Sequence, residues 1–192
     1  MSKYPSEQEC IDILKRAGCN RRVIIHCCTV NTVAKQMAKK IPCNKDLVVA
    51  GALLHDVGRA VDHSIFHAVT GADMMAELSM PKEIQDIVRK HTGAGLDDED
   101  VRAMGLPPGD YIPSTIEEKI VAHADNMVSD NILVPHEHSV EKLVSKGAIR
   151  GAERMERLHL ELSKLYGEDL DVIVHLLGEH PRITGPCGKY IS

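Results

Sequence analysis

The stretch that decides the fold is Leu53-Leu54-His55-Asp56-Val57-Gly58-Arg59. It ends an apolar run that begins at residue 47, and it places an imidazole beside a carboxylate just before a glycine. Burying His55 and Asp56 together is unfavourable unless a positive partner compensates both, and a metal ion would do so. The alternative is an ordinary helix end, with Gly58 as its cap and His55 near the negative end of the helix dipole.

The composition favours a single all-α domain over residues 1–192. A length of 192 residues is enough for one domain with a sizeable core. The chain has one Phe, four Tyr and no Trp, so aliphatic residues must form the core, which favours packed helices over a β-sandwich. A net charge of −5 argues against general nucleic-acid binding, because such binding requires a basic surface.

The sequence predicts a soluble, cytoplasmic protein. Residues 1–10 lack the apolar stretch of a signal peptide, and the longest uncharged apolar run is far too short to span a bilayer. The cysteines show no C-x-x-C spacing and are Cys10, Cys19, Cys27, Cys28, Cys43 and Cys187. Since neither a zinc knuckle nor an easy disulfide between Cys27 and Cys28 fits this pattern, we expect reduced, mostly buried thiols.

Apolar residues at helical spacing predict helices along most of the chain. The predicted helices cover about residues 7–17, 20–40, 44–55, 65–78, 81–91, 114–128, 139–166 (interrupted at Gly147 and Gly151) and 170–177. Residues 94–113 are predicted to be a loop whose acidic run, residues 97–100, forms a solvated face or a mobile flap. The C-terminal helices, residues 139–178, are expected to pack on the part between about residues 20 and 130 or to cover its site.

Several polar residues lie where apolar ones are expected on the buried faces of these helices: His26, His55, Asp56, His91 and Asp125. A single such histidine is more often a core residue than a ligand. Four helices that each bring a nitrogen or a carboxylate to one interior describe a metal site in a helical core. Imidazole and carboxylate ligands together suit iron, manganese, cobalt, nickel or zinc. We expect His123 to be structural or solvent-facing, and assign no role to the remaining C-terminal histidines.

The order of these residues resembles the HD-domain metal-dependent phosphohydrolase superfamily. In that superfamily a first histidine precedes a His-Asp pair, and a distant aspartate follows. The pattern maps here onto His26, His55-Asp56 and Asp125, within roughly residues 22–130. The resemblance implies an HD-type helical bundle with the metal site in its core, and an enzyme that hydrolyses a phosphate ester or anhydride.

A subset of this superfamily adds two histidines and binds two metal ions. His67, with Gly71 four residues later, and His91, followed by Thr92 and Gly93, are similar to those histidines. The arrangement resembles the HD hydrolases that cleave diadenosine tetraphosphate. This sequence lacks the His-Thr-Thr-Gly-like run of that group, so the substrate of the group does not carry over.

The resemblance implies two ion positions that share one carboxylate. The first position would be held by His26, His55, Asp56 and Asp125, and the second by His67 and His91 with Asp56 as the bridge. His63 is the alternative to His67, and the glycine spacing favours His67. We expect two divalent transition-metal ions per chain, iron foremost, with manganese, cobalt, nickel or zinc as alternatives.

Such a centre would act on a small phosphorylated substrate, expected to be a nucleotide. Two ions about 3.5–4 Å apart can share a water, lower its pKa to about 7 and hold the phosphoryl group under attack. Asp56 and Arg59 are the expected catalytic residues, because Asp56 would fix the separation of the ions and Arg59 can bind phosphate in a bidentate way. Lys90, Arg22 and Thr92 are weaker candidates for substrate binding, since each can equally be a surface residue.

Other functions fit part of the pattern. A single-metal nucleoside monophosphate phosphatase would need neither His67 nor His91. A non-catalytic nucleotide-binding sensor is less favoured because every expected ligand position is filled, and an HD oxygenase or a purely structural helical protein has weaker support. Residues 130–154 come next along the chain after the predicted helix that carries Asp125, and are predicted to cover the mouth of the site. The sequence does not indicate an oligomeric state.

Overall fold

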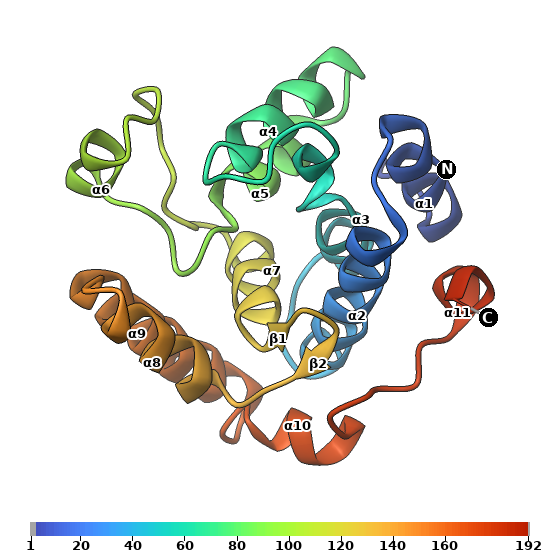
Figure 1. The fold of residues 1–192 in the computed structure, drawn as a ribbon. Coiled ribbons are helices and arrows are strands. Elements are labelled where there is room, and N and C mark those ends of the chain that lie inside the picture. Colours follow the sequence, from blue (N-terminus) through green and yellow to red (C-terminus); the bar gives the residue numbers. More distant parts are fainter. Residues whose placement is uncertain (1–2, 192) are drawn as a thin grey trace.

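The computed structural model describes residues 3–191, and the regular secondary structure of this part of the chain is almost entirely helical (Figure 1). Its elements are α1 (Glu7–Ala17), α2 (Arg21–Met37), α3 (Lys45–Leu54), the 3-10 helix η1 (Val57–Ala60), α4 (His67–Glu77), α5 (Lys82–Lys90), α6 (Asp98–Ala103), α7 (Ile116–Asn126), β1 (Val128–Ser129), β2 (Ile132–Leu133), α8 (His136–Ser145), α9 (Ile149–Tyr166), α10 (Val172–Leu177) and α11 (Gly185–Ile191). β1 and β2 form a short antiparallel hairpin in which Val128 pairs with Leu133. The predicted all-α class is confirmed.

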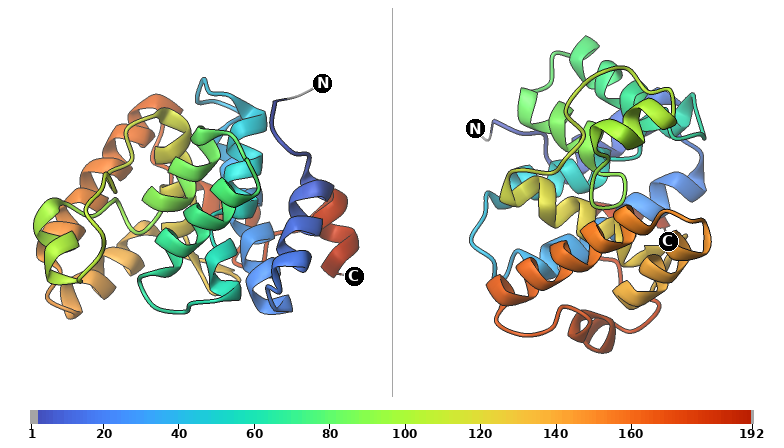
Figure 2. Two further views of the ribbon diagram at one scale, coloured as in Figure 1. Left: turned by 90° about the horizontal axis from the view of Figure 1, so that it is seen from above. Right: turned by 90° about the vertical axis from the view of Figure 1, so that its left-hand side faces the viewer.

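Three central helices, α2, α3 and α7, pack against one another. The helices α4 and α5 cover one side of them, while α8 and α9 lie at one end of the molecule and α1 and α11 at the other (Figures 1 and 2). The core is aliphatic, as the composition predicts, and Val30, Leu53, Ile84 and Ile120 are fully buried in it. Burial of such side chains is the main favourable contribution to folding.

Side-chain caps fix where the central helices begin. The Asn20 and Asn44 side chains accept backbone hydrogen bonds at the first turns of α2 and α3. At the start of α7 the capping box pairs Thr115 with Glu118, one residue later than the predicted Ser114-x-x-Glu117 pair. The helix α3 ends at Leu54, so the His-Asp pair stands at the junction between α3 and η1 rather than inside a longer helix.

The acidic run that was predicted to be a solvated or mobile loop is instead folded as α6. Asp97 caps this helix and forms a capping box with Asp100. The carboxylates then pair with two arginines of α9: Arg154 Nη1 lies 2.7 Å from Asp97 Oδ2, and Arg150 Nη2 lies 3.2 Å from Asp100 Oδ1. The prediction of a loop was wrong because the partner cations lie fifty or more positions further along the sequence, whereas Asp98 and Glu99 are exposed, as expected of a solvated face.

A disulfide corrects the expectation that all cysteines are reduced. Cys28 on α2 and Cys187 on α11 are bonded to each other, with their Cα atoms 5.7 Å apart, a separation typical of disulfides. The other cysteines, Cys10, Cys19, Cys27 and Cys43, are free thiols, and all but Cys43 are buried. Spacing gave no indication of the pair, because its members are 159 positions apart.

The C-terminal third forms two long helices and two short ones. The predicted interruption at Gly147 is confirmed, since this residue has φ +75° between α8 and α9, but Gly151 lies within α9 and does not interrupt it. The helix α11, which was not predicted, lies beside α1 in Figures 1 and 2. Among residues 3–191, every helix falls short of the length and apolar character that crossing a bilayer requires.

Candidate metal centre

Two glycines set the position of the His55-Asp56 turn against α4. A Cβ atom at Gly58 would lie 2.0 Å from the carbonyl oxygen of His67, and one at Gly71 would lie 3.0 Å from the Gly58 nitrogen. Only residues without a side chain allow η1 and α4 to approach so closely. The contact brings the first turn of α4, and with it His67, next to Asp56.

The ring nitrogens of the four predicted histidine ligands share one arrangement. In each of them Nδ1 hydrogen-bonds a backbone carbonyl oxygen: His26 with Asp130 at 2.5 Å, His55 with Ala52 at 2.8 Å, His67 with Ser64 at 2.6 Å and His91 with Val88 at 2.7 Å. A backbone carbonyl can only accept, so each Nδ1 carries a proton and each Nε2 is the ring nitrogen that faces the cluster. This is the arrangement that orients histidines as metal ligands.

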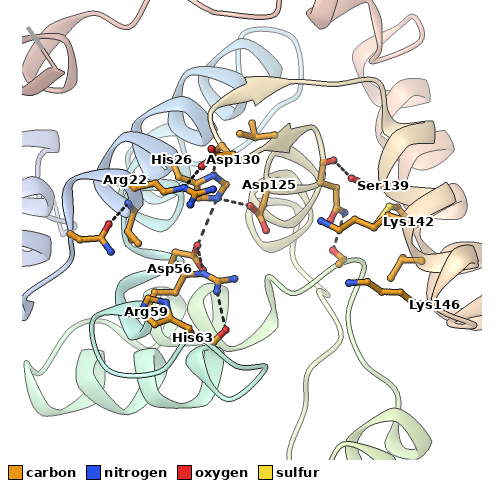
Figure 3. Close-up of a pocket in the computed structure, with 17 residues that line it drawn as sticks. Arg22, His26, Asp56, Arg59, His63, Asp125, Asp130, Ser139, Lys142 and Lys146 are labelled. Carbon is orange, nitrogen blue, oxygen red and sulfur yellow. Dashed lines mark hydrogen bonds and ion pairs between the residues drawn. The ribbon is translucent and has the colours of Figure 1, made fainter.

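The first predicted ion position is bounded by His26, His55, Asp56 and Asp125. The distances from Asp125 Oδ1 to the Nε2 atoms of His26 and His55 are 2.9 and 3.5 Å. Asp56 Oδ2 lies 3.7 Å from His26 Nε2 and 3.8 Å from His55 Nε2. Figure 3 shows His26, Asp56 and Asp125 directed toward one another from α2, the end of α3 and α7.

The other oxygen of Asp56 faces the second predicted position. Asp56 Oδ1 lies 3.2 Å from His67 Nε2 and 3.4 Å from His91 Nε2, and these two nitrogens are 3.1 Å apart. The carboxylate therefore has one oxygen toward each pair of histidines. This is the geometry that a carboxylate bridging two cations requires.

The donors present fit a cationic group. His55 Nε2 and Asp56 Oδ1 are buried and have no hydrogen-bond partner among the described residues. Leaving such an atom unpaired costs about 1–3 kcal/mol, so a ligand that uses both atoms relieves a real cost. Imidazole nitrogens combined with carboxylate oxygens suit a divalent transition metal. His55, Asp56 and His91, and likewise His26, His55 and Asp125, each bring ligand atoms within 4.8 Å of one another.

The electrostatics of the cluster favour positive charge. Burial opposes ionisation of Asp56 and Asp125, but the neighbouring imidazoles, His55 first, hold the pKa of both carboxyl groups below its usual value. Burial also opposes a charged His26, yet the hydrogen bond and the charge of Asp125 raise the pKa of His26 to about 9. Burial lowers the pKa of His91. The carboxylates thus remain ionised and attract cations.

A pocket of about 540 Å³ opens onto this cluster, and two of the predicted substrate-binding residues line it. Arg59 Nε donates to Asp56 Oδ2 at 2.6 Å, which holds the guanidinium at the edge of the cluster. Arg22 is exposed at the pocket and pairs with Asp130 at 2.7 Å. Both cations can reach an anion in the pocket.

The other two predicted substrate-binding residues are not among the pocket-lining residues. The Lys90 ammonium group is buried and lies 2.8 Å from Asp110 and 3.4 Å from Glu118, so these carboxylates neutralise it. The Thr92 hydroxyl is buried without a hydrogen-bond partner in the described part of the chain. Sequence position alone placed both beside His91, but their side chains do not face the pocket.

His63 and His67 occupy different places. His63 is exposed and lines the pocket, whereas His67 is 4% exposed and has its Nε2 atom at Asp56. The structure therefore brings His67, and not His63, to the Asp56 carboxylate. His63 lies at the rim, where Arg59 contacts its backbone oxygen (Figure 3).

Sequence reasoning missed one wall of the pocket and a second histidine cluster. The helix α8 contributes Lys142 to the pocket, and its C-cap residue, Lys146, also lines it, from a segment predicted only to cover the pocket. Like charges four positions apart, with no acidic residue three or four positions away from either, were the available signal.

The second histidine cluster joins His123, His136 and His159 from α7, α8 and α9. His123 Nε2 lies 3.0 Å from His159 Nδ1, and the His136 and His159 rings stack with their centroids 3.5 Å apart. Asp171 accepts hydrogen bonds from both the backbone N–H and Nδ1 of His136, each at 2.9 Å, and His159 Nε2 lies 3.2 Å from Asp169. His123 is fully buried, so of the two expectations for it the structural one holds.

The HD domain family matches residues 23–130, which include both ends of the His26 to Asp125 pattern. The chain belongs to the HD domain family. Membership in this family implies a divalent-metal site, and the histidine and aspartate clusters of this HD domain can hold one. The narrower likeness to the diadenosine tetraphosphate-cleaving subset stays a prediction.

Relatives extend the comparison beyond the HD domain itself. The chain is 45% identical over 172 residues to a tRNA (cytidine(56)-2'-O)-methyltransferase of Picrophilus torridus, covering 89% of this chain and 50% of that protein. It is 41% identical over 126 residues to an uncharacterised protein of Methanocaldococcus jannaschii, covering 63% of this chain and 74% of that protein. The chain thus spans about half the length of the methyltransferases it matches.

A solved structure shares the fold. The HD domain of the Listeria monocytogenes phosphodiesterase PgpH, in complex with cyclic-di-AMP, matches with a TM-score of 0.56 and 19% sequence identity, covering 85% of this chain and 97% of that chain. Similarity at this level of identity shows a common HD fold.

Proposed function

We propose that this chain is a metal-dependent phosphohydrolase with a binuclear centre that acts on a nucleotide. The main support for the proposal is that the two oxygens of the Asp56 carboxylate face different pairs of histidines. Oδ2 faces His26 and His55, and Oδ1 faces His67 and His91. Two ions held in this way would lower the pKa of a water and stabilise charge on the phosphoryl group, and iron or manganese is the expected metal.

The side chains of the chain itself would supply binding and orientation. The four Nε2 atoms and the carboxylates of Asp56 and Asp125 would hold the ions. Arg59 lies beside Asp56 and would bind a phosphate oxygen, where its planar guanidinium can donate two hydrogen bonds. Arg22 lines the same pocket and would add positive charge near its mouth.

A nucleotide substrate is supported by the relatives. PgpH is named as a phosphodiesterase, and its HD domain binds cyclic-di-AMP, which is a nucleotide with phosphodiester bonds. The Picrophilus torridus relative is named for an activity on tRNA, which is also built of phosphodiesters. A phosphodiester between nucleosides is therefore the substrate bond we propose.

Metal content and hydrolysis together test the proposal. Protein purified without chelators and without air should retain close to two transition-metal ions per chain by elemental analysis, and should cleave nucleotide phosphodiesters. In the His91→Ala variant we expect about one ion fewer and strongly reduced hydrolysis, because the second position loses one of its two histidines. An exposed histidine at the rim offers the control: His63→Ala should retain both ions.

Two results would contradict the binuclear proposal. One ion per chain that is unaffected by His91→Ala would favour the single-metal nucleoside monophosphate phosphatase. Failure to retain any ion after addition of Mn²⁺ or Fe²⁺ would leave the nucleotide-binding sensor as the better explanation.

The 45% identity to a tRNA methyltransferase favours a second candidate, in which the chain supports tRNA methylation. In that case the protein would bind tRNA and stimulate or perform methyl transfer from S-adenosylmethionine. Incubation with tRNA and labelled S-adenosylmethionine tests it, and Asp56→Asn separates the candidates. Loss of hydrolysis in Asp56→Asn with methylation intact would assign the Asp56 cluster to hydrolysis alone.

A further inference from the structure

One face of α8 forms the wall of the pocket that lies across from Arg59. Ser139, Lys142, Leu143 and Lys146 line the pocket, and their spacing of three and four positions places them on a single helix face. Figure 3 shows Lys142 and Lys146 on the opposite side of the pocket from Arg59 and His63, with the Asp125 carboxylate between the two groups.

The two lysines differ from the other cations near the site because they have no anionic partner in residues 3–191. Arg59 is paired with Asp56, and Arg22 with Asp130. The side chains of Lys142 and Lys146 are exposed and form no hydrogen bond or ion pair within the described chain. Their neighbours three and four positions away are neutral or basic, so α8 itself offers no carboxylate to them. Two unpaired ammonium groups facing one pocket attract a dianion.

The wall that carries these lysines is anchored beside the metal ligands. Ser139 Oγ donates to the backbone oxygen of Asn126 at 2.6 Å, and Asn126 directly follows Asp125. The Asn126 side chain in turn donates to the Gly93 oxygen at 3.0 Å, two positions after His91. Leu143 packs against the hydrophobic core. The backbone that carries the lysines is therefore held in place relative to both predicted ion positions.

We propose that Lys142 and Lys146 bind a second phosphate of the substrate, separate from the phosphate that is attacked. This inference rests on the proposed function and specifies its substrate class: a dinucleotide or oligonucleotide in which a nucleoside separates two phosphates. The attacked phosphodiester lies at the Asp56 cluster and Arg59, and the neighbouring phosphate lies at α8. The second phosphate lies across the pocket from Arg59, so it would contribute to affinity and take no part in the hydrolysis.

A pair of matched substrates tests this proposal. The dinucleotide ApA contains one phosphate, and its 5′-phosphorylated form pApA contains two. We expect the metal-loaded protein to have a KM for pApA roughly tenfold below that for ApA, the effect of one or two charge-assisted contacts. Lys142→Ala and Lys146→Ala, alone and combined, should raise the KM for pApA toward that for ApA, with a much smaller change in the KM for ApA.

The chain offers matched controls. Lys164 is exposed on α9 and outside the pocket lining, so Lys164→Ala should keep the full preference. Lys142→Arg keeps the positive charge and should therefore keep most of the preference for pApA over ApA. A preference for pApA that survives in the double alanine variant would overturn the proposal, as would an equal loss for both substrates.

Competition by free nucleotides shows whether the lysines bind the neighbouring phosphate of a dinucleotide or the polyphosphate tail of a mononucleotide. If ATP inhibits far better than AMP in the unmodified protein but not in the double variant, while pApA and ApA bind alike, the lysines hold a polyphosphate and the dinucleotide class is wrong. If neither dinucleotide is cleaved, the proposed function fails, and equilibrium binding of fluorescent ApA and pApA still decides the role of the lysines. Equal binding of both ligands would then overturn it.

Discussion

The molecule contains two histidine clusters, and they differ in what holds each ring. In the central cluster, His26, His55, His67 and His91 all direct Nδ1 to a backbone carbonyl, so every Nε2 faces the shared carboxylates of Asp56 and Asp125. In the C-terminal cluster, the ring nitrogens of His136 and His159 already contact carboxylates or another histidine. The first arrangement turns four ring nitrogens toward two shared carboxylates, as in a metal site, whereas in the second His136 and His159 contact different acidic residues.

Stacking separates the clusters further. The His136 and His159 rings are nearly parallel, 12° apart, so their nitrogens point side by side and do not converge. The rings of His26 and His55 are tilted by 59°, and those of His55 and His91 by 75°. Converging nitrogens around shared carboxylates distinguish a metal centre from a structural network, even where both clusters bring ligand atoms equally close.

The strongest test of this comparison is the same substitution in each cluster. Asp56→Asn removes the carboxylate shared by both ion positions, so we expect loss of bound metal and a fall in hydrolysis of roughly a thousandfold, as when a preorganised charge-stabilising group is lost. Asp171→Asn should leave metal content and kcat essentially unchanged. Metal analysis and turnover of both variants provide the measurement, and loss of an ion in Asp171→Asn would show that the C-terminal cluster also binds metal.

A smaller effect is expected from breaking the C-terminal cluster at its centre. His159→Asn removes the contact to His123 Nε2 and leaves that buried nitrogen unpaired, which should lower the free energy of unfolding by about 1–3 kcal/mol. Urea denaturation of metal-loaded protein measures the loss. The metal content should not change. A variant as stable as the unmodified protein would mean that the network contributes little.

The smallest expected effect is a pH dependence. Burial, followed by the charge of His136, lowers the pKa of His159, and burial lowers the pKa of His123 to about 3. Below the ordinary histidine pKa of about 6.5, both histidines are protonated in the unfolded chain but stay neutral in the folded chain. The free energy of unfolding therefore falls as the pH falls. Between pH 7.5 and 5.5 we expect a loss of about 1 kcal/mol that is smaller in His159→Asn. An identical loss in both proteins would contradict this assignment.

Much of the central site could be predicted because its signals are local. A histidine or an aspartate on an otherwise apolar helix face is conspicuous in the sequence, and side-chain caps such as Asn20 and Asn44 mark where the helices begin. The glycine spacing that favoured His67 over His63 also has a local cause, since Gly71 is one helical turn from His67. The chain order of the polar residues was sufficient to indicate the HD family.

The features that were missed depend on partners far apart in the sequence. Lys90 was predicted to bind substrate, but Asp110 and Glu118 neutralise it, and only folding brings them together. The Cys28–Cys187 disulfide and the pairing of α6 with the arginines of α9 have the same origin. No periodicity within one helix reports on such contacts.

By itself, the sequence determined the helical class and indicated the residues that we propose as metal ligands, because hydrophobic spacing and residue chemistry act over one or two helical turns. The tertiary structure decided how the Asp56 oxygens divide between two pairs of histidines, and which lysines face the pocket from α8. Those features depend on the relative placement of separate helices, which long-range packing of the core fixes.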